Sequence, residues 1–475
     1  MSKIKSILHN ISYTISSNFI SLVVSILITL ILPRILGVEE YGYYQLYLFY
    51  LSFVGFLHLG WCDGVYLKYG GIQYETLDKK AFKGQYILFI LFQFLVSILF
   101  LFVFLIFLKS SSEKNIVIIS VLFNILIVNG RNYLLLIMQA TNRMKDYSFS
   151  VIFDRLIFMV LSFLLILFGF KDFQFFIFAD IVGKIISFIW TATTLKEMTF
   201  NLTGKYVLNL KETFENILIG SSLMFANIAS TLIIGIIRFG IQIRWSVVFF
   251  GKVSLALSIS NILMIFINAI SLGIFPLLKK IDSHIYKKAY FILKFLLLPL
   301  MFIVLTLFFP ISFLLVHWLP NYKESIDYMA ILFPIIVFES KVGLLTNTFF
   351  KALRKEKIIF KVNVLTAILS FIVTFFTCYI LGDLTSTIYG IVFLLGFRST
   401  ISEIYISKIF GIKIAKDLFI EILMVLIFIL CNHFYSGING FLMYIFFVLI
   451  YILLNINNLR NVLKFSREIF LNSEI

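Results

Sequence analysis

The sequence predicts an all-α polytopic membrane protein with about fourteen transmembrane helices. Of its 475 residues, 61% are hydrophobic, 57 are Phe and only 13% are charged, whereas a soluble domain is about half apolar and a quarter charged. Apolar runs of about 20 residues, enough to cross a hydrocarbon core of ~30 Å, recur from end to end. These runs are unbroken rather than alternating, which favours helices over the strands of a barrel.

Fourteen apolar runs are long enough to be spans. The N-terminal run is too long for a signal peptide and no small-residue cleavage site follows it, so we expect it to remain as the first helix. The expected spans are 12–33, 42–60, 83–108, 115–138, 148–168, 174–195, 216–244, 247–275, 288–309, 326–350, 361–381, 386–407, 416–433 and 437–456.

The basic residues predict which loops face the cytoplasm. With the N-terminus inside and the helices alternating, the inner segments and the adjoining helix ends hold 26 of the 40 Lys and Arg, and the outer loops hold five. Positive charge in short loops marks the cytoplasmic side. We therefore expect a multi-pass membrane protein with both termini cytoplasmic. Cytoplasmic anchoring accounts for the net charge of +16 without nucleic acid as a partner.

The sequence holds no pattern of soluble-type catalysis or metal binding. Cys62, Cys378 and Cys431 lie far apart, and the five His have no ligand spacing. No nucleophile stands with its base, and no loop holds a glycine-rich phosphate cradle. We expect no metal, no cofactor and no enzyme activity, and place the chemistry within the helices.

A repeat divides the first twelve spans into two sets of six. Asn18 and Asn227 each precede a glycine by 24 residues, at an offset of 209, and the segment 139–145 has a counterpart at 351–357, at an offset of 212. Because six is even, both sets start inside and the repeat is parallel, and transporters commonly place their site between such repeats. The expected parts are an N-lobe at 1–195, a cytoplasmic linker at 196–215, a C-lobe at 216–407, and two extra helices with a cytoplasmic tail at 408–475.

Short motifs resemble those of polysaccharide flippases. The junction 33–42 reads PRILGVEEYG and is similar to the Pro-Arg-x-Leu-Gly-x-x-x-Tyr-Gly pattern of Wzx-type O-antigen flippases, in the multidrug/oligosaccharidyl-lipid/polysaccharide exporter superfamily. In one departure, Ile237 precedes Arg238, where family members often carry an acid, so ion coupling through that acid has no support here. Partial matches at 140–143, 227–238, 269–276 and 319–322 extend the resemblance over about residues 10–410.

The resemblance implies a function. Such flippases have two lobes around a cationic cavity and work by alternating access. They carry an undecaprenyl-diphosphate-linked oligosaccharide from the inner to the outer leaflet for cell-surface polysaccharides such as O-antigen or capsule. The implied partners are the lipid-linked oligosaccharide, membrane lipids and other polysaccharide assembly proteins.

Two other functions stay open. A drug/cation antiporter of the same superfamily should bury carboxylates without a surplus of buried basic residues. Beyond the first two residues of each span, however, the spans hold nine basic and five acidic residues. A membrane polysaccharide polymerase usually carries a large outer loop, and the predicted outer loops are short. Both alternatives therefore fit the sequence less well than a flippase.

Charged residues inside the spans are candidates for function, because each costs roughly 2.5–3.5 kcal/mol at a lipid-facing midplane. Asp180 and Lys184 are four residues apart and are expected to pair. Arg398 could reach Glu403, and Lys294 is expected to extend along its helix to the membrane surface. The charges assigned either to ion coupling or to structure are Asp180, Lys184, Glu339, Lys341 and Arg398.

A diphosphate ligand requires fixed cationic donors, and a guanidinium matches the geometry of phosphate oxygens. Arg238 lies six residues deeper in its span than Arg244 and is the strongest candidate, whereas Arg34 and Arg244 also fit as anchors at the interface. Two tyrosines of the second span could stack on sugar rings. The candidate substrate-binding residues are Arg238, Arg34, Arg244, Lys252, Tyr47 and Tyr50.

Overall fold

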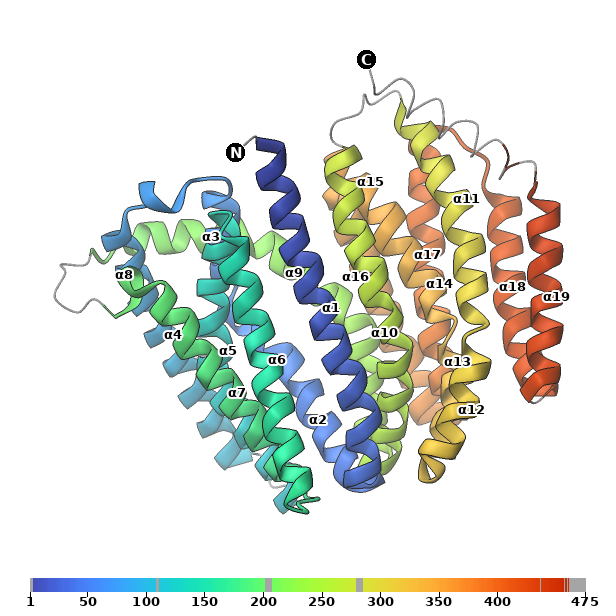
Figure 1. Ribbon diagram of the computed structural model, residues 1–475, viewed down its shortest axis with the longest axis horizontal. Coiled ribbons are helices and arrows are strands. Elements are labelled where there is room, and N and C mark those ends of the chain that lie inside the picture. The colour runs from blue at the N-terminus through green and yellow to red at the C-terminus, as the bar shows by residue number, and fades with distance from the viewer. Residues whose placement is uncertain are drawn as a thin grey trace. The chain divides into compact units, whose positions relative to one another are not determined.

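The computed structural model describes residues 3–107, 111–200, 207–278, 285–435, 437–456, 458 and 460. Side chains at 3–18, 107, 263, 265–266 and 268–277 lie outside the described set, and the motif residue Asn18 and the motif segment 269–276 are among them. Every regular element in the described residues is a helix (Figure 1). The prediction of an all-α polytopic protein is confirmed.

The chain folds as two compact units, unit 1 at Met1–Ile228 and unit 2 at Ala229–Ile475. Helix α9 (Leu210–Arg244) crosses the boundary. Unit 1 contains α1 (Lys3–Leu36), α2 (Val38–Val54), η1 (Gly55–His58), α3 (Trp61–Tyr69), η2 (Tyr74–Thr76), α4 (Lys79–Phe107), α5 (Ser112–Ala140), α6 (Met144–Leu167), α7 (Phe173–Thr194) and α8 (Lys196–Thr199).

Unit 2 holds the remaining helices, two of which are π-helical segments continuous with α-helices. These are η5 (Lys341–Thr346) and η6 (Phe376–Leu381). The others are α10 (Val247–Leu278), α11 (Tyr286–Leu305), α12 (Phe308–Trp318), η4 (Pro320–Tyr322), α13 (Lys323–Leu332), α14 (Ile335–Ser340), α15 (Asn347–Ala352), α16 (Glu356–Phe375), α17 (Leu384–Phe410), α18 (Ala415–Phe434) and α19 (Gly437–Leu454).

Eleven helices in the described residues are long and apolar enough to cross a membrane, and two bent pairs raise the number to thirteen. The pairs bend by 60° between His58 and Trp61 and by 45° between Leu332 and Ile335. The span expected at 247–275 falls on α10, in which the described apolar stretch is shorter, Val247–Ile262. Each expected span therefore coincides with a helix or a bent pair, but the count of fourteen is not confirmed.

Local sequence explains both bends. In the first, Leu59 and Gly60 adopt φ of 52° and 84°, a left-handed conformation that ends a helix. In the second, Pro334 precedes α14, and proline removes a backbone donor from the helix that would otherwise continue. Both breaks divide a single apolar run into two shorter helices.

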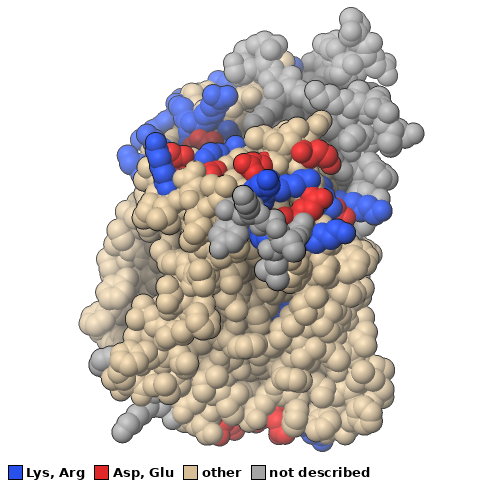
Figure 2. Space-filling model, turned by 90° about the vertical axis from the view of Figure 1, so that its left-hand side faces the viewer, with Lys and Arg blue, Asp and Glu red and all other residues tan. Residues whose placement is uncertain are grey.

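Charged side chains on the surface follow the expected membrane pattern. On the face drawn in Figure 2, blue and red side chains gather at one end, a few lie at the opposite end, and an almost uncharged band separates them. A lipid-facing band with charges at its edges is what the bilayer requires.

Helix α3 packs against the start of α9 with almost no side chains between the two backbones. A Cβ atom added at Gly64 would lie 1.7 Å from the Asn216 carbonyl oxygen, and one added at Gly220 would lie 2.0 Å from the Gly60 carbonyl oxygen. Only glycine allows such close approach. At the end of α3, the Tyr69 hydroxyl donates to Glu212. The first turns of α9 are thereby fixed within unit 1.

Candidate functional site

Unit 1 contains a buried polar cluster around Asp180 of α7. Lys184, one turn further along the helix, forms an ion pair with Asp180, which confirms the predicted pair. Tyr47 of α2 is fully buried and donates its hydroxyl hydrogen to Asp180 at 2.5 Å, while the Asn124 amide of α5 donates to the Tyr47 hydroxyl at 3.0 Å. The sequence suggested that the Tyr47 ring could stack on a sugar, but in the structure its hydroxyl links α2 to α5 and α7.

A second ion pair in unit 1 joins α5 to α6. Arg131 Nη1 lies 2.6 Å from Asp154 Oδ2, and Nη2 donates to the Ser150 carbonyl at 3.1 Å. Arg131 and Asp154 lie in the consecutive spans expected at 115–138 and 148–168. An opposite charge at similar depth in the next helix was the available signal for this pair.

In unit 2, Arg398 of α17 is held by three partners from other helices. Its guanidinium lies 2.9 Å from Glu339 Oε1 and 3.0 Å from the Asn363 side-chain oxygen, and it donates to the Ser230 hydroxyl at 3.0 Å. The expected contact with Glu403 is wrong. The two residues are five apart on one helix, so they point to different sides of it.

Unit 2 also contains a larger buried charge cluster. Lys341 at the start of η5 lies 2.8 Å from Glu403 and 2.6 Å from Glu421. Lys294 of α11 lies 2.6 Å from Glu403 and 2.7 Å from Asp417. Lys294 is 3% exposed, so the expectation that it reaches the membrane surface is wrong: its ammonium faces two carboxylates inside the unit instead.

The five acids identified in the spans are all used within these clusters. Each contacts at least one Lys or Arg of the same unit. A carboxylate already paired with a basic residue is a poor partner for a cationic drug, because the drug would have to displace that residue. The acids are Asp154, Asp180, Glu339, Glu403 and Glu421.

The predicted phosphate-binding residues of unit 2 lie on α9 and α10. Arg238 is partly buried, with its guanidinium carbon 5.1 Å from the centre of the Phe250 ring and Nη2 donating to Ser254 at 2.9 Å. Lys252 pairs with Glu324 at 2.9 Å, which weakens its case as an anion ligand. Arg244 is exposed.

The remaining candidates belong to unit 1. Arg34 is exposed near the end of α1, and Tyr50 is partly buried on α2. The role of these two residues, like that of Arg238, stays a prediction.

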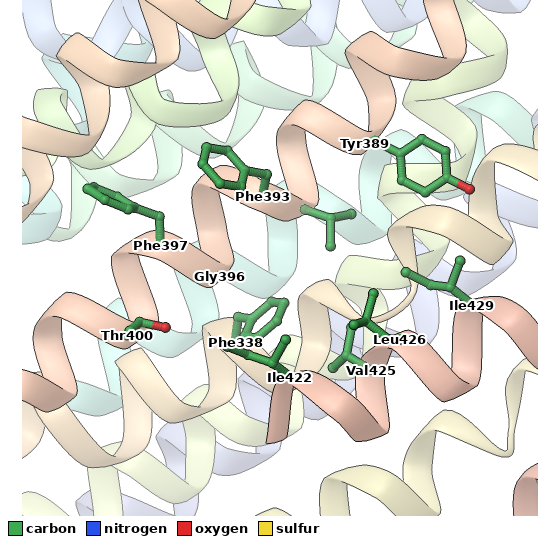
Figure 3. A pocket seen from close by; sticks show the side chains of 11 residues that line it. Phe338, Tyr389, Phe393, Gly396, Phe397, Thr400, Ile422, Val425, Leu426 and Ile429 are labelled. Carbon is green, nitrogen blue, oxygen red and sulfur yellow. The ribbon is translucent and has the colours of Figure 1, made fainter. Parts of the chain in front are cut away.

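An apolar groove lies wholly within unit 2, between α14, α17 and α18 (Figure 3). It offers about 540 Å³ of space, and Figure 3 shows Phe393 and Phe397 of α17 on one side and Ile422 and Leu426 of α18 on the other. Gly396 leaves room beside the Phe338 ring, which a Cβ atom there would approach to 3.3 Å. With this lining, the groove suits a hydrocarbon chain and not a sugar.

Two solved structures share this fold. The lipid II flippase MurJ in an inward closed conformation aligns with a TM-score of 0.62 at 14% identity, over 94% of this chain and 99% of its own. An inward-facing multidrug resistance MATE family transporter of the MOP superfamily aligns with a TM-score of 0.61 at 11% identity, over 83% of this chain and 98% of its own. A comparison with curated protein sequences finds no match.

The family is shown by the sequence itself. The model of a family described as "Polysaccharide biosynthesis protein" matches residues 7–282, which is more than half of the 475 residues. This range includes the motifs at 33–42, 140–143 and 227–238. The chain therefore belongs to the polysaccharide biosynthesis protein family, as those motifs predicted, and it shares its fold with the MurJ flippase and the MATE family transporter.

Proposed function

We propose that this protein is a flippase that moves an undecaprenyl-diphosphate-linked oligosaccharide from the inner to the outer leaflet of a bacterial inner membrane. The observation that carries the proposal is the family match over residues 7–282. The fold shared with a lipid II flippase supports it. In this proposal both termini are cytoplasmic, and the two lobes alternate in access to the two sides.

The electrical term favours this direction of transport. When the inside is negative, moving a diphosphate of charge about −2 outward lowers its electrical free energy by roughly 4.6 kcal/mol per 100 mV. The cost of removing that charge from water remains, however, and fixed cationic donors reduce it. The substrate site therefore has to present guanidinium or ammonium groups.

Arg238 is the residue that best meets this requirement. Ser254 and the Phe250 ring hold its guanidinium from α10, so its planar fork is already oriented before an anion arrives. An oriented fork loses less conformational entropy on binding a phosphate than a mobile side chain does. We assign Arg238 the main contact with the diphosphate and Arg244 a secondary contact, and the expected role of Arg34 of unit 1 stays a separate prediction.

Unit 2 also contains a suitable binding site for the lipid part of the substrate. The groove between α17 and α18 is lined by hydrocarbon and aromatic side chains, and it lies among helices long enough to span the membrane. A prenyl chain placed there exchanges contacts with lipid tails for van der Waals contacts with these side chains, at no electrostatic cost. We assign the groove to the polyprenyl chain.

Transport of a lipid-linked oligosaccharide in proteoliposomes tests the function. We expect the wild type to move the substrate between leaflets and Arg238→Ala to lower the rate at least tenfold. Arg238→Lys should restore only part of the rate, because an ammonium cannot bind phosphate through two parallel hydrogen bonds. Arg143→Lys is the matched control, since Arg143 contacts Asp146 at the start of α6 and should leave the rate unchanged.

Two outcomes would contradict the proposal at different levels. Wild-type transport by Arg238→Ala at normal abundance would remove this residue from the site but leave the function standing. Failure of the wild-type protein to move any lipid-linked sugar, together with export of a cationic dye, would replace the flippase by an antiporter.

A further inference from the structure

The buried charges of unit 2 form one continuous chain of alternating sign. Asp417 contacts Lys294 at 2.7 Å, Lys294 contacts Glu403 at 2.6 Å, Glu403 contacts Lys341 at 2.8 Å, and Lys341 contacts Glu421 at 2.6 Å. Three carboxylates thus face two ammonium groups. When all five groups are ionised, this chain of buried side chains has a net charge of −1.

The position of each carboxylate in the chain decides where a proton can bind. Glu403 is central and fully buried, and each of its oxygens faces a different lysine. Glu421 stands at one end, with both oxygens on Lys341 alone, and its side chain is 2% exposed. A buried carboxylate with one cationic partner is harder to keep ionised than one with two. Of the two buried carboxylates, Glu421 should therefore bind a proton more readily than Glu403.

Asp417 stands at the other end and is 31% exposed. Asp417 and Glu421 are four residues apart and one turn apart on α18, and both line a small cavity of about 10 Å³, which is space for a single water. Lys294, Tyr451 and Asn455 complete its polar lining. A water there would connect the exposed acid to the buried one.

The other titratable groups that face the chain are two tyrosines. Tyr290 of α11 interacts with Glu403, and Tyr451 of α19 interacts with Asp417 and Glu421. A tyrosine stays neutral at physiological pH, so neither compensates the extra negative charge. Among the described groups at this site, a proton on a terminal carboxylate is what makes the chain neutral.

The geometry points to a proton-binding site: we propose that the buried charge chain takes up one proton on Glu421. The proton reaches Glu421 through Asp417 and the small cavity, and its binding loosens α18 from η5. The ionised Glu421 carboxylate ties α18 to Lys341. Protonation places a hydrogen on one oxygen and leaves a neutral acid beside the ammonium, which is a weaker contact. The π-helical start of η5 at Lys341 fits this role, since such segments often occur at functional sites.

Infrared difference spectroscopy on the purified protein tests where the proton binds. Stepping from mildly alkaline to mildly acidic buffer should produce a carboxylic-acid C=O band from a buried group, and Glu421→Gln should abolish it. Asp146→Asn, which removes a carboxylate of unit 1 outside the chain, should leave the band in place. A band of full amplitude in Glu421→Gln would overturn the proposal.

A conservative variant covers the case in which Glu421→Gln does not fold. Glu421→Asp keeps a titratable group one methylene shorter, so the band should persist at a shifted frequency. A frequency identical to that of the wild type would assign the proton to another residue and overturn the proposal.

Hydrogen exchange on the wild type tests the release of α18. After correction for the intrinsic pH dependence of exchange, acidification should raise the exchange of amides in 415–434 several-fold, while amides in 112–140 of unit 1 stay unchanged. No difference between the two segments would show that the proton does not loosen α18. Neither measurement depends on transport, so failure here leaves the proposed flippase function untouched.

Discussion

Units 1 and 2 both bury charged side chains between helices, but they connect them over different distances along the chain. In unit 1, Asp180 and Lys184 are four residues apart, and Arg131 and Asp154 are 23 apart. In unit 2, the contacts of Lys341 with Glu403 and Glu421 join residues 62 and 80 apart. The buried ion pairs of unit 1 therefore lie within one helix or join two consecutive helices, whereas those of unit 2 connect four helices into one block.

The units also differ in how their helices approach each other. In unit 1, α3 meets α9 through glycines, with the backbone of one helix almost touching that of the other. In unit 2, α17 and α18 stand apart across an apolar groove (Figure 3). An added methyl group should therefore lower stability more at the tight backbone contact than beside the open groove.

Lys341→Met should have the largest effect on stability. The substitution removes the partner of two fully or nearly fully buried carboxylates, Glu403 and Glu421. Breaking a buried ion pair on one side costs about 3–5 kcal/mol. We expect a strongly lowered midpoint of thermal unfolding in detergent and reduced abundance in the membrane.

Arg131→Met in unit 1 is the comparison for this prediction. Its partner Asp154 also lies near Lys184 and Arg155, so the remaining charges partly compensate for the loss. We expect a cost of about 2–3 kcal/mol, typical of a hydrogen bond to a charged group. An Arg131→Met variant that unfolds more easily than Lys341→Met would show that the cluster of unit 2 is not the more tightly coupled one.

The same difference in chain separation explains what the sequence could predict. The helical fold, the positions of the spans and the Asp180–Lys184 pair all follow from local patterns of apolar and charged residues. The partners of Arg398 and Lys294 depend on which helices pack together, and no local pattern contains that information. The bend at Leu59 and Gly60 was likewise missed, because an apolar run looks the same whether its helix is straight or broken.

The substrate-binding residues illustrate a further limit. Arg238 could be selected from its depth in α9, but its contacts with Phe250 and Ser254 depend on how α10 packs against that helix. Tyr47 was selected as a tyrosine of the second span that could face a ligand, but its hydroxyl donates to Asp180. A face can be read from periodicity, whereas a partner cannot. The predicted parallel repeat likewise concerns packing and stays a prediction.

Gly64→Ala and Gly396→Ala should separate the two kinds of helix contact. At Gly64 the added methyl group meets a backbone oxygen at 1.7 Å, which cannot move without shifting α9, and overpacking of this kind costs about 1–3 kcal/mol. At Gly396 it meets the Phe338 ring at 3.3 Å, and the helix propensity gained from alanine, about 1 kcal/mol, offsets the crowding.

Thermal unfolding of the two glycine variants in detergent measures the difference. We expect a clear decrease in the unfolding midpoint for Gly64→Ala and little change for Gly396→Ala. Equal decreases would mean that the space beside Gly396 is as tightly packed as the contact between α3 and α9.

The smallest expected effect concerns the first residue before α17 in unit 2, where Asp383 caps the helix. Ser386 donates its backbone N–H to Asp383 Oδ2 at 2.6 Å, and hydrogen bonds from the side chain and backbone of Ser386 hold the pKa of Asp383 below its usual value. Asp383→Ala should cost about 1 kcal/mol near neutral pH. Because the folded state has the lower pKa, this stabilisation is complete above the usual pKa of about 4 and is lost as the pH falls through the folded value.

Ser111 provides the matched control in unit 1. Its hydroxyl caps α5 by accepting the backbone N–H of Lys114 at 3.4 Å, and a hydroxyl does not titrate in this range. Ser111→Ala should therefore cost a similar or smaller amount that is the same at acidic and neutral pH, whereas the cost of Asp383→Ala should shrink on acidification. Unfolding midpoints of both variants at several pH values would decide this. A pH-independent cost for Asp383→Ala would mean that its carboxylate contributes to the cap by shape and not by charge.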